Sequence, residues 1–392
     1  MTRSHEPFLL SMPNSRSDNS QVYDRLDRVG EILDYLSCTS ILLVADPVAF
    51  EQSGASRLLE QVLESRKADV FSEFAPNPSL EALEDGIRHY HSVQPDVILA
   101  VGGGTAIDLA KLIGFCSVQE VDPVDLIKSP LSNPRKGVPV IVAPTTAGTG
   151  SEATHFAVVY LEGQKYSVAH SYLLPDFAIL DSTLTNTMPP NITADTGLDA
   201  ICQAIESMWS VRSTEESIAY AAESIQLAWR HLKTAVQRPS EDDRRAMCQA
   251  AHLAGKAINI SKTTAPHAIS YTITSRFGVA HGRAVALTLG AVLGFNDKVS
   301  DSDCSDDRGV EYVRQIVGDI VQLLGFETSQ DAVHGIRDLL IALDCPTKLS
   351  EVGATTAEQI EDIASRVNVN RLSNNPRRFT PESLRTILHS IR

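Results

Sequence analysis

Three side chains in the second half of the sequence form a plausible ligand set for a metal ion: Asp199, His267 and His281. An aspartate and two histidines suit a catalytic divalent ion, because three protein ligands leave coordination positions open for a substrate. Gln203 follows Asp199 by four residues in a helical pattern, so the two share one helix face. Either histidine taken alone is more often structural, and the hypothesis therefore depends on the whole set.

Two loops in the first half have the composition of phosphate-binding loops. The first is Gly102-Gly103-Gly104-Thr105, which joins an apolar run to a helical segment. Glycines let the backbone approach a phosphate closely, and a helix N-terminus presents free N–H groups. The second loop, 143–152, also follows an apolar run and is rich in hydroxyls. Both patterns favour a dinucleotide site, and a tight turn without a ligand is the alternative. The hydroxyl residues of the second loop are Thr145, Thr146, Thr149 and Ser151.

Asp46 ends the first apolar run of the sequence and is a candidate for the cofactor ribose. Its carboxylate can accept a hydrogen bond from a ribose hydroxyl, and its charge would disfavour the additional phosphate of NADP(H). A simple role in ending the strand is the competing interpretation.

The elements that must position these residues change in character near residue 188. Before it, buried strands at 40–45, 69–74, 96–101 and 139–143 alternate with helical segments at 48–66 and 79–93, which predicts a parallel α/β sheet. After it, helical periodicity dominates, at 214–236, 241–258, 308–324 and 329–343. We therefore predict an α/β dinucleotide-binding domain over 1–188 and a helical metal- and substrate-binding domain over 189–392.

Composition excludes several classes of function. The net charge of −15 disfavours nucleic acids and anionic membranes as partners, because both require a basic surface. The six cysteines form no CxxC pair, which is typical of reduced thiols in a cytoplasmic protein. The first 20 residues lack the apolar core of a signal peptide, and no apolar run is long enough to cross a membrane.

Several of these motifs, in this order, resemble the iron-containing (group III) alcohol dehydrogenases. The pieces that carry the resemblance are Gly102–Thr105 with Asp108 and Lys111, the loop 145–152, Pro175–Asp181, Gly197–Ala200 and the two histidines. The resemblance covers nearly the whole chain. It implies a Rossmann-like α/β domain, an all-α C-terminal domain, and a cleft between them that binds NAD(H) or NADP(H) and a divalent metal, Fe²⁺ or Zn²⁺. It is also compatible with a homodimer.

The resemblance implies a role for individual residues. The metal ligands are Asp199, Gln203, His267 and His281, and the glutamine departs from the family, which normally has histidine there. Tyr271 stands where many relatives have another histidine, and it is a candidate proton donor beside His267 and His281. The cofactor-binding candidates are Asp46, Gly102, Gly103, Gly104, Thr105, Asp108, Thr145, Thr146, Thr149, Ser151 and Lys165.

The segment ahead of His267 indicates an anionic substrate. Lys262, Thr263 and Thr264 precede that histidine, and Arg283 follows His281 by two residues. Lysine and arginine with hydroxyl donors suit a phosphate or phosphonate group. The alternative is that Lys262 and Arg283 are exposed or pair with carboxylates. This segment, with 204–216, is similar to the phosphonoacetaldehyde reductase subgroup, which implies reduction of phosphonoacetaldehyde to 2-hydroxyethylphosphonate.

Other functions remain compatible with the sequence. Glutamine at 203 also fits a metal-free reductase of a carboxylated substrate, in the manner of maleylacetate reductases. It also fits a nucleotide-binding protein that has lost catalysis, although the two histidines oppose that interpretation. A cyclase of the dehydroquinate synthase type is a more distant alternative.

Overall fold

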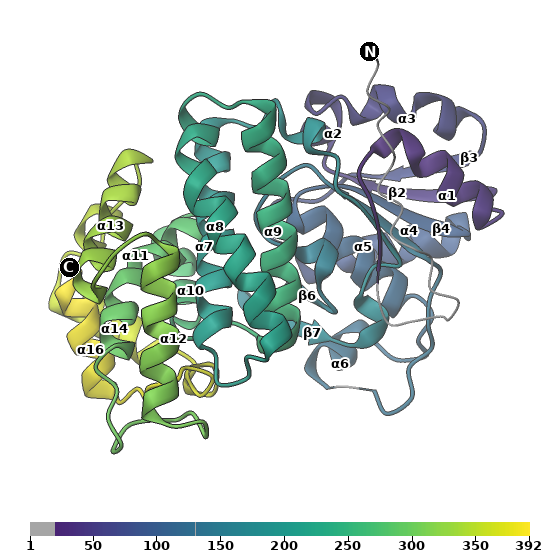
Figure 1. Ribbon diagram of the computed structural model, residues 1–392. Helices are drawn as coiled ribbons and strands as arrows, with labels where there is room; N and C mark the ends of the chain where they lie inside the picture. Colours follow the sequence, from purple (N-terminus) through teal and green to yellow (C-terminus); the bar gives the residue numbers. More distant parts are fainter. Residues whose placement is uncertain (1–19, 130) are drawn as a thin grey trace, which may run out of the picture.

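The computed structural model describes residues 20–129 and 131–392, except for the side chains of residues 369 and 370. The prediction that the N-terminus lacks the apolar core of a signal peptide concerns residues 1–19, which are outside the described residues. Figure 1 shows an α/β half, in purple and blue, beside a helical half in teal, green and yellow. The division at 188/189 stays a prediction, although the sheet ends at β8 (Phe177–Ile179) and the first long helix, α7, begins at Pro190.

The first half contains a six-stranded parallel sheet in the order β1-β8-β5-β4-β2-β3. Its strands are β1 (Gln21–Tyr23), β2 (Ser40–Ala45), β3 (Lys67–Phe71), β4 (Val97–Gly102), β5 (Val140–Pro144) and β8. The helices are α1 (Val29–Tyr35), α2 (Pro47–Gln52), α3 (Ala55–Glu64), α4 (Leu80–Val93), α5 (Gly104–Cys116) and α6 (Pro123–Lys128). The predicted parallel α/β sheet is confirmed.

Alternation along the strands places helices on both faces of the sheet. Leu42 and Val44 of β2 pack in one core with α4 and α5, whereas Ile41 and Leu43 pack in a second core with α1 and α3. Successive side chains of a strand point to opposite faces, so a strand buried on both faces must be apolar throughout. All six residues of β2 are buried accordingly.

The sequence analysis was incomplete in this half, because β1, β8, α1 and α6 were not predicted and the strand predicted over 69–74 spans Lys67–Phe71. The helix predicted over 48–66 is two helices, because Gly54 between α2 and α3 has φ 79°, a left-handed conformation that glycine adopts without strain. An antiparallel hairpin, β6 (Phe156–Leu161) and β7 (Gln164–Ala169), was not predicted. Its importance is that it supplies one wall of the functional site.

The second half is helical, as predicted. Its helices are α7 (Pro190–Trp209), α8 (Glu215–Gln237), α9 (Glu241–Ser261), α10 (Ala265–Phe277), α11 (His281–Asn296), α12 (Val310–Leu323), α13 (Ser329–Ala342), α14 (Ala357–Arg366), α15 (Val369–Leu372) and α16 (Pro381–Ser390). No helix of the described chain has both the length and the apolar character needed to span a bilayer.

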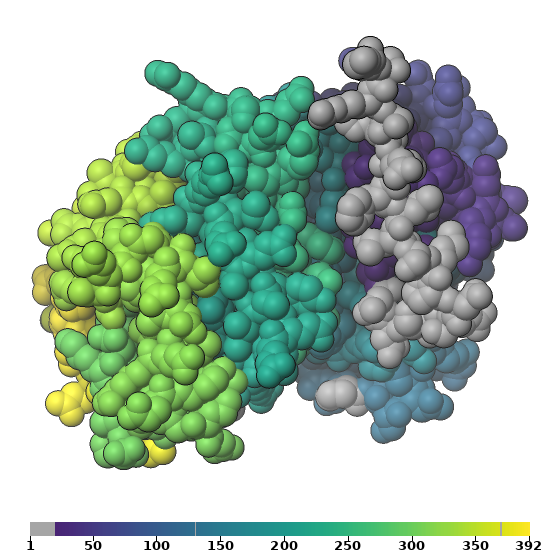
Figure 2. All heavy atoms as spheres, viewed as in Figure 1, coloured from purple at the N-terminus to yellow at the C-terminus, as the bar shows by residue number. Residues whose placement is uncertain are grey.

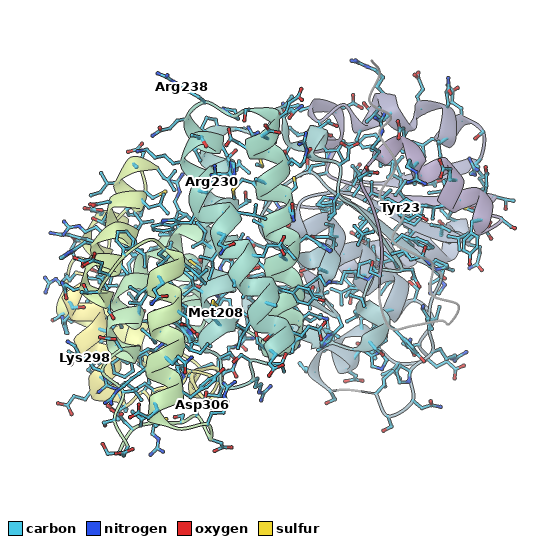
Figure 3. All side chains as sticks on the ribbon, in the orientation of Figure 1. Tyr23, Met208, Arg230, Arg238, Lys298 and Asp306 are labelled. Carbon is cyan, nitrogen blue, oxygen red and sulfur yellow. The ribbon has the colours of Figure 1, made fainter. Side chains whose placement is uncertain are left out.

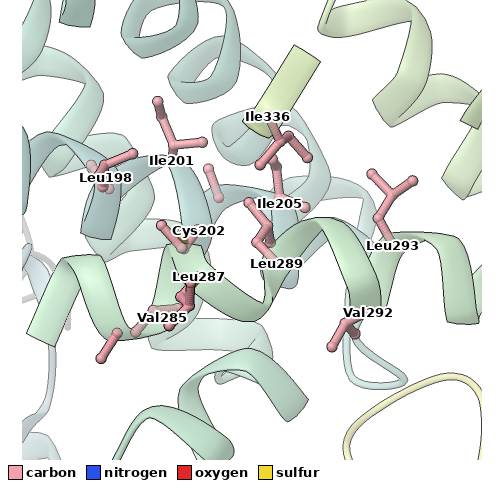
Figure 4. Close-up of a cluster of buried hydrophobic side chains, with 14 of the residues drawn as sticks. Leu198, Ile201, Cys202, Ile205, Val285, Leu287, Leu289, Val292, Leu293 and Ile336 are labelled. Atoms are coloured by element: carbon pink, nitrogen blue, oxygen red, sulfur yellow. The ribbon is translucent and has the colours of Figure 1, made fainter. Parts of the chain in front are cut away.

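Helix α7 lies at the centre of the helical half, and nearly all of its residues after Thr193 are buried. Figure 4 shows Ile201 and Ile205 of α7 in one apolar cluster with Leu289 of α11 and Ile336 of α13. Helix α8 covers this core with one face only. Met208 of α7 lies within the bundle in Figure 3, whereas Arg230 of α8 and Arg238, the residue that follows α8, extend toward solvent.

The two halves meet where α9 and the loop after β5 pack closely. A side chain on Gly150 would come within 2.5 Å of the Gly255 backbone, so only glycine allows this approach. The side chain of Arg244 on α9 donates to the Met188 carbonyl oxygen at 3.1 Å, which fixes the connection between the halves. The space-filling view in Figure 2 shows the teal helices next to the blue and purple half.

Candidate active site

The proposed metal ligands lie together in the cleft between the halves. Asp199 is on α7, His267 is near the start of α10, and His281 is the first residue of α11. Their ligating atoms all lie within 4.8 Å of one another. The Nε2 atom of His267 is 3.2 Å from Oδ1 of Asp199, and that of His281 is 4.0 Å from the same oxygen. The tertiary structure therefore assembles a cluster from three helices.

Gln203 lies one turn after Asp199 on the same face of α7, and its side chain is buried. Its Nε2 donates to Oδ2 of Asp199 at 3.0 Å and to the Thr149 carbonyl oxygen at 3.3 Å. Its Oε1 is buried and has no hydrogen-bond partner among the described residues. A buried acceptor without a partner is costly. The residues present therefore fit a divalent cation, for which Oε1 would be an additional oxygen ligand.

Histidine in place of Gln203 is expected to tighten the binding of Fe²⁺ or Zn²⁺, because imidazole is a better ligand than a neutral amide for both ions. The measurement is the rate and extent of metal loss to a chelator in wild type and Gln203→His. Gln249→His, at an exposed position of α9, is the matched control and should behave as wild type. Equal metal loss from wild type and Gln203→His would show that position 203 does not contact the metal.

Sequence reasoning missed Glu206, the carboxylate that orients His267. Glu206 is fully buried on α7, and its Oε1 forms a short contact with Nδ1 of His267. Its Oε2 accepts from the backbone N–H of Thr264 at 2.6 Å and from the Thr264 hydroxyl at 3.0 Å. Burial alone would lower the pKa of His267, but the charges of Glu206 and Asp199 raise it to about 10. The only signal in the sequence was its spacing of seven residues from Asp199, which places both on one helix face.

The predicted cofactor residues surround the junction of β4 and α5. Gly103 is the N-cap of α5, and a side chain on Gly104 would come within 2.8 Å of Thr149. The backbone N–H of Thr145 donates to the Gly102 carbonyl oxygen at 2.9 Å, which joins the two predicted loops. The structure thus brings together the Gly102–Thr105 turn and the loop containing Thr145, Thr146, Thr149 and Ser151.

Lys111 stabilises the hydroxyl-rich loop 143–152 through hydrogen bonds to its backbone and to the start of β6. Its ammonium group is buried and donates to the carbonyl oxygens of Ser151 at 2.9 Å and Phe156 at 2.6 Å. Asp108 accepts from the Ser151 hydroxyl and, at 2.9 Å, from the Val158 backbone N–H. Burial is the larger effect on the pKa of Lys111 and lowers it to about 8, while Asp108 opposes the shift. This network ties α5, the loop and the hairpin together.

Two further cofactor candidates have definite places. Asp46 ends β2 and lies beside the glycine turn, where its Oδ1 accepts from the Ala49 backbone N–H at 2.8 Å and caps α2. The N-cap role and the predicted ribose contact are compatible, because Oδ2 makes no hydrogen bond with the described residues. Lys165 reaches from β7 over the ring of Tyr271, with its ammonium nitrogen 4.1 Å from the ring centroid.

Tyr271 lies directly beside the proposed metal ligands. Its ring stacks on that of His281, with centroids 5.7 Å apart and an interplanar angle of 5°. The Arg371 guanidinium lies 4.7 Å from the same ring centroid. Burial would raise the pKa of Tyr271, but the positive charges of Lys165 and Arg371 outweigh it and lower the pKa. This environment favours proton donation by the phenol.

Among the predicted substrate residues, Lys262, Thr263 and Thr264 line the cleft, and Arg283 does not. Arg283 instead forms an ion pair with Asp195 of α7. The reason is helical geometry: α11 starts at His281, so residue 283 lies about 200° further around the helix and faces away from the cluster. This is a correction to the substrate site inferred from sequence, and the ion-paired alternative describes Arg283.

The cleft that contains these residues has a volume of about 740 Å³. Its walls are the start of α5, the hairpin β6–β7, helices α7, α10 and α11, and the segment that contains Arg371. A larger, more open groove of about 1190 Å³ between α11, α12, α13 and α16 contains none of the predicted site residues. The cleft, rather than the groove, is therefore the candidate active site.

Comparison with known proteins identifies the family. A family profile described as iron-containing alcohol dehydrogenase matches residues 20–182, and one described as the C-terminal part of the same family matches residues 193–392. The chain belongs to the iron-containing alcohol dehydrogenase family. It is accordingly an oxidoreductase, and the family and fold predicted from sequence are confirmed.

Individual members of the family resemble the chain over most of its length. The phosphonoacetaldehyde reductase of Streptomyces viridochromogenes is 34% identical over 310 residues, which are 77% of each chain. The long-chain-alcohol dehydrogenase 1 of Geobacillus thermodenitrificans is 34% identical over 278 residues, 69% of each chain. The solved structure of sulfoacetaldehyde reductase from Bifidobacterium kashiwanohense with NAD⁺ is 29% identical, with a TM-score of 0.85 over 97% of this chain and 99% of that one.

Proposed function

We propose that this member of the family reduces a small anionic aldehyde with NAD(P)H and a divalent metal, Fe²⁺ or Zn²⁺. The specific reaction is the conversion of phosphonoacetaldehyde to 2-hydroxyethylphosphonate. Relatives named for phosphonoacetaldehyde and sulfoacetaldehyde support an aldehyde with an anionic head group. The NAD⁺ bound to the second of these supports a nicotinamide cofactor.

The charge of the cleft is the observation that carries the proposal. Four cationic side chains line it in a protein whose net charge is −15. None of the four is within ion-pair distance of a carboxylate in the described part of the chain. Three of the four are half-buried and Arg212 is exposed. Positive charges that are partly removed from water and gathered in one cleft favour the binding of a complementary anion. These cations are Lys165, Arg212, Lys262 and Arg371.

The residues of the chain divide the chemistry among them. Asp199, His267, His281 and the Oε1 atom of Gln203 would hold the metal, and the Gly102–Thr105 turn would hold the cofactor phosphates. The chemistry supplied by these groups when bound is polarisation of a carbonyl oxygen by the cation and donation of a hydride by the reduced nicotinamide. The Tyr271 hydroxyl donates the proton that the product alkoxide requires. The hairpin β6–β7 shields this reaction from water.

We propose further that the division at 188/189 separates a cofactor-binding part from a metal- and substrate-binding part.

All six cysteines are free, and five of them are buried. Such thiols suit a reducing compartment, which supports a location in the cytoplasm.

A panel of aldehydes tests the proposed function. We expect kcat/KM to be highest for phosphonoacetaldehyde, lower for sulfoacetaldehyde and a carboxylated aldehyde, and lowest for propanal, each assayed with NADH and with NADPH. Metal analysis of protein purified without chelator belongs to the same experiment. Equal or better turnover of propanal would contradict an anionic substrate. Full activity without metal and a preference for the carboxylated aldehyde would favour the maleylacetate reductase-like alternative.

A further inference from the structure

The cations of the cleft fall into two groups. Lys165 lies over the ring of Tyr271, and this ring stacks on His281, which places Lys165 at the metal end of the cleft. Burial, with a smaller contribution from the positive charge of Arg212, lowers the pKa of Lys262 to about 8. Lys262 therefore has another cation, and no carboxylate, as its charged neighbour among the described residues.

Lys262 has a backbone conformation that is unusual for any residue except glycine. It follows the last residue of α9 with φ 63° and ψ 173°. This region is essentially restricted to glycine, and other residues found there are commonly at functional sites. Its ammonium group lies 3.0 Å from Nε2 of His155 and 4.7 Å from the centroid of the Phe156 ring. Neither neighbour compensates for its charge as an anion would.

The surrounding structure holds this strained residue in place. Asn374 donates from Nδ2 to the carbonyl oxygens of Ser261 and Thr263, at 2.9 Å each. The Ser210 hydroxyl donates to the Ser261 oxygen at 2.8 Å. These hydrogen bonds clamp the backbone on both sides of Lys262. They also bring the segments that carry Arg212 and Arg371 to the same place, because Ser210 is two residues before Arg212 and Asn374 is three residues after Arg371.

We infer that Arg212, Lys262 and Arg371 form one oxyanion subsite, which binds the charged end of the aldehyde substrate. The inference rests on the proposed function and replaces Arg283 with two arginines from other segments. Arg371 lies against the ring of Tyr271, which stacks on His281, so one aromatic ring separates the Arg371 end of this subsite from a proposed metal ligand. The subsite therefore favours a short aldehyde whose anionic group is close to the carbonyl. Two guanidinium groups and an ammonium group suit a tetrahedral dianion such as a phosphonate.

Kinetics of Arg212→Met, Lys262→Met and Arg371→Met test the subsite. Each variant should lose about 10- to 150-fold in kcat/KM for phosphonoacetaldehyde, the loss expected for one charge-assisted hydrogen bond. Arg212→Met and Lys262→Met should reduce propanal at the wild-type rate, because propanal has no anionic group. Arg371→Met also removes a positive charge beside Tyr271, so it should slow both aldehydes, with the larger loss for phosphonoacetaldehyde. Arg245→Met, at an exposed position of α9 where Arg245 pairs with Asp242, is the control for the loss of one charge outside the cleft.

Inhibition by ethylphosphonate gives a readout that is independent of turnover of the anionic aldehyde. With propanal as the substrate, ethylphosphonate should inhibit wild type, and its inhibition constant should rise about 10- to 150-fold in the three cleft variants. A wild type that prefers phosphonoacetaldehyde, together with variants that keep the preference and the inhibition, would overturn the subsite and leave the proposed function intact. A wild type with no preference for anionic aldehydes would overturn the proposed function itself.

Lys262→Gly separates binding from folding. Glycine adopts the backbone conformation of residue 262 without strain, so this variant should have a Tm equal to or above that of wild type. Its kcat/KM for phosphonoacetaldehyde should still fall as in Lys262→Met. A clear loss of thermal stability, with unchanged discrimination between the two aldehydes, would show that Lys262 serves the fold and would contradict its role in the subsite.

Discussion

Valine in place of Gly103 is expected to abolish binding of the nicotinamide cofactor while the protein stays folded. Gly103 caps α5 with φ −78° and ψ −171°, a conformation open to any residue, and a Cβ atom there would meet Thr146 at 3.4 Å. The fold can therefore accept a side chain at this position. A cofactor pyrophosphate could not bind at the N-terminus of α5 in this variant, because the branched side chain would occupy its place.

Titration with NADH, followed by fluorescence, measures this effect, and circular dichroism with a thermal melt verifies the fold. Gly318→Val is a matched control, since nothing lies within 4 Å of a Cβ atom added at that glycine of α12. Gly104 is less suitable as a test, because its side chain would collide with Thr149 even without cofactor. An unchanged NADH titration in Gly103→Val would remove the glycine turn from the proposed cofactor site.

Glutamine in place of Glu206 should lower metal affinity and kcat by about 10- to 100-fold, the usual cost of losing the partner of a metal-ligating histidine. The carboxylate accepts from both His267 and the Thr264 backbone. The glutamine amide has the same shape, but its NH₂ group is a donor. This group would face either Nδ1 of His267 or the Thr264 backbone N–H, which are donors themselves. His267 would then lose the orientation that directs Nε2 toward Asp199.

Metal retention against a chelator distinguishes this positioning role from a structural one. Asp243→Asn is the control, because Asp243 also pairs with a histidine, His231, at 2.8 Å, but on α8 and α9 away from the cleft. That variant should lower the Tm and leave metal affinity unchanged. If Glu206→Gln lost thermal stability to a similar extent and kept its metal as firmly as Asp243→Asn, the positioning role would be refuted.

Motifs whose function depends on neighbours in sequence could be predicted from sequence. The run 41–45 is apolar at every position, as expected for a strand buried on both faces, and the structure has β2 there. The glycine turn was placed correctly between a strand and a helix, because both flanks have their own periodicity. The shared helix face of Asp199 and Gln203 could also be predicted, because four residues make about one turn of an α-helix.

Relations between distant segments were decided by the tertiary structure. Arg283 is near His281 in sequence, but α11 turns it toward Asp195, whereas Arg212 and Arg371 reach the cleft from segments that are distant from both histidines in the sequence. Glu206 is recognisable as a partner of His267 only after α7 and α10 have packed together. Local sequence determines which face of a helix or strand a residue occupies. What that face meets depends on the packing of elements far apart in the chain, and here that packing decides which cations lie free in the cleft and which are neutralised outside it.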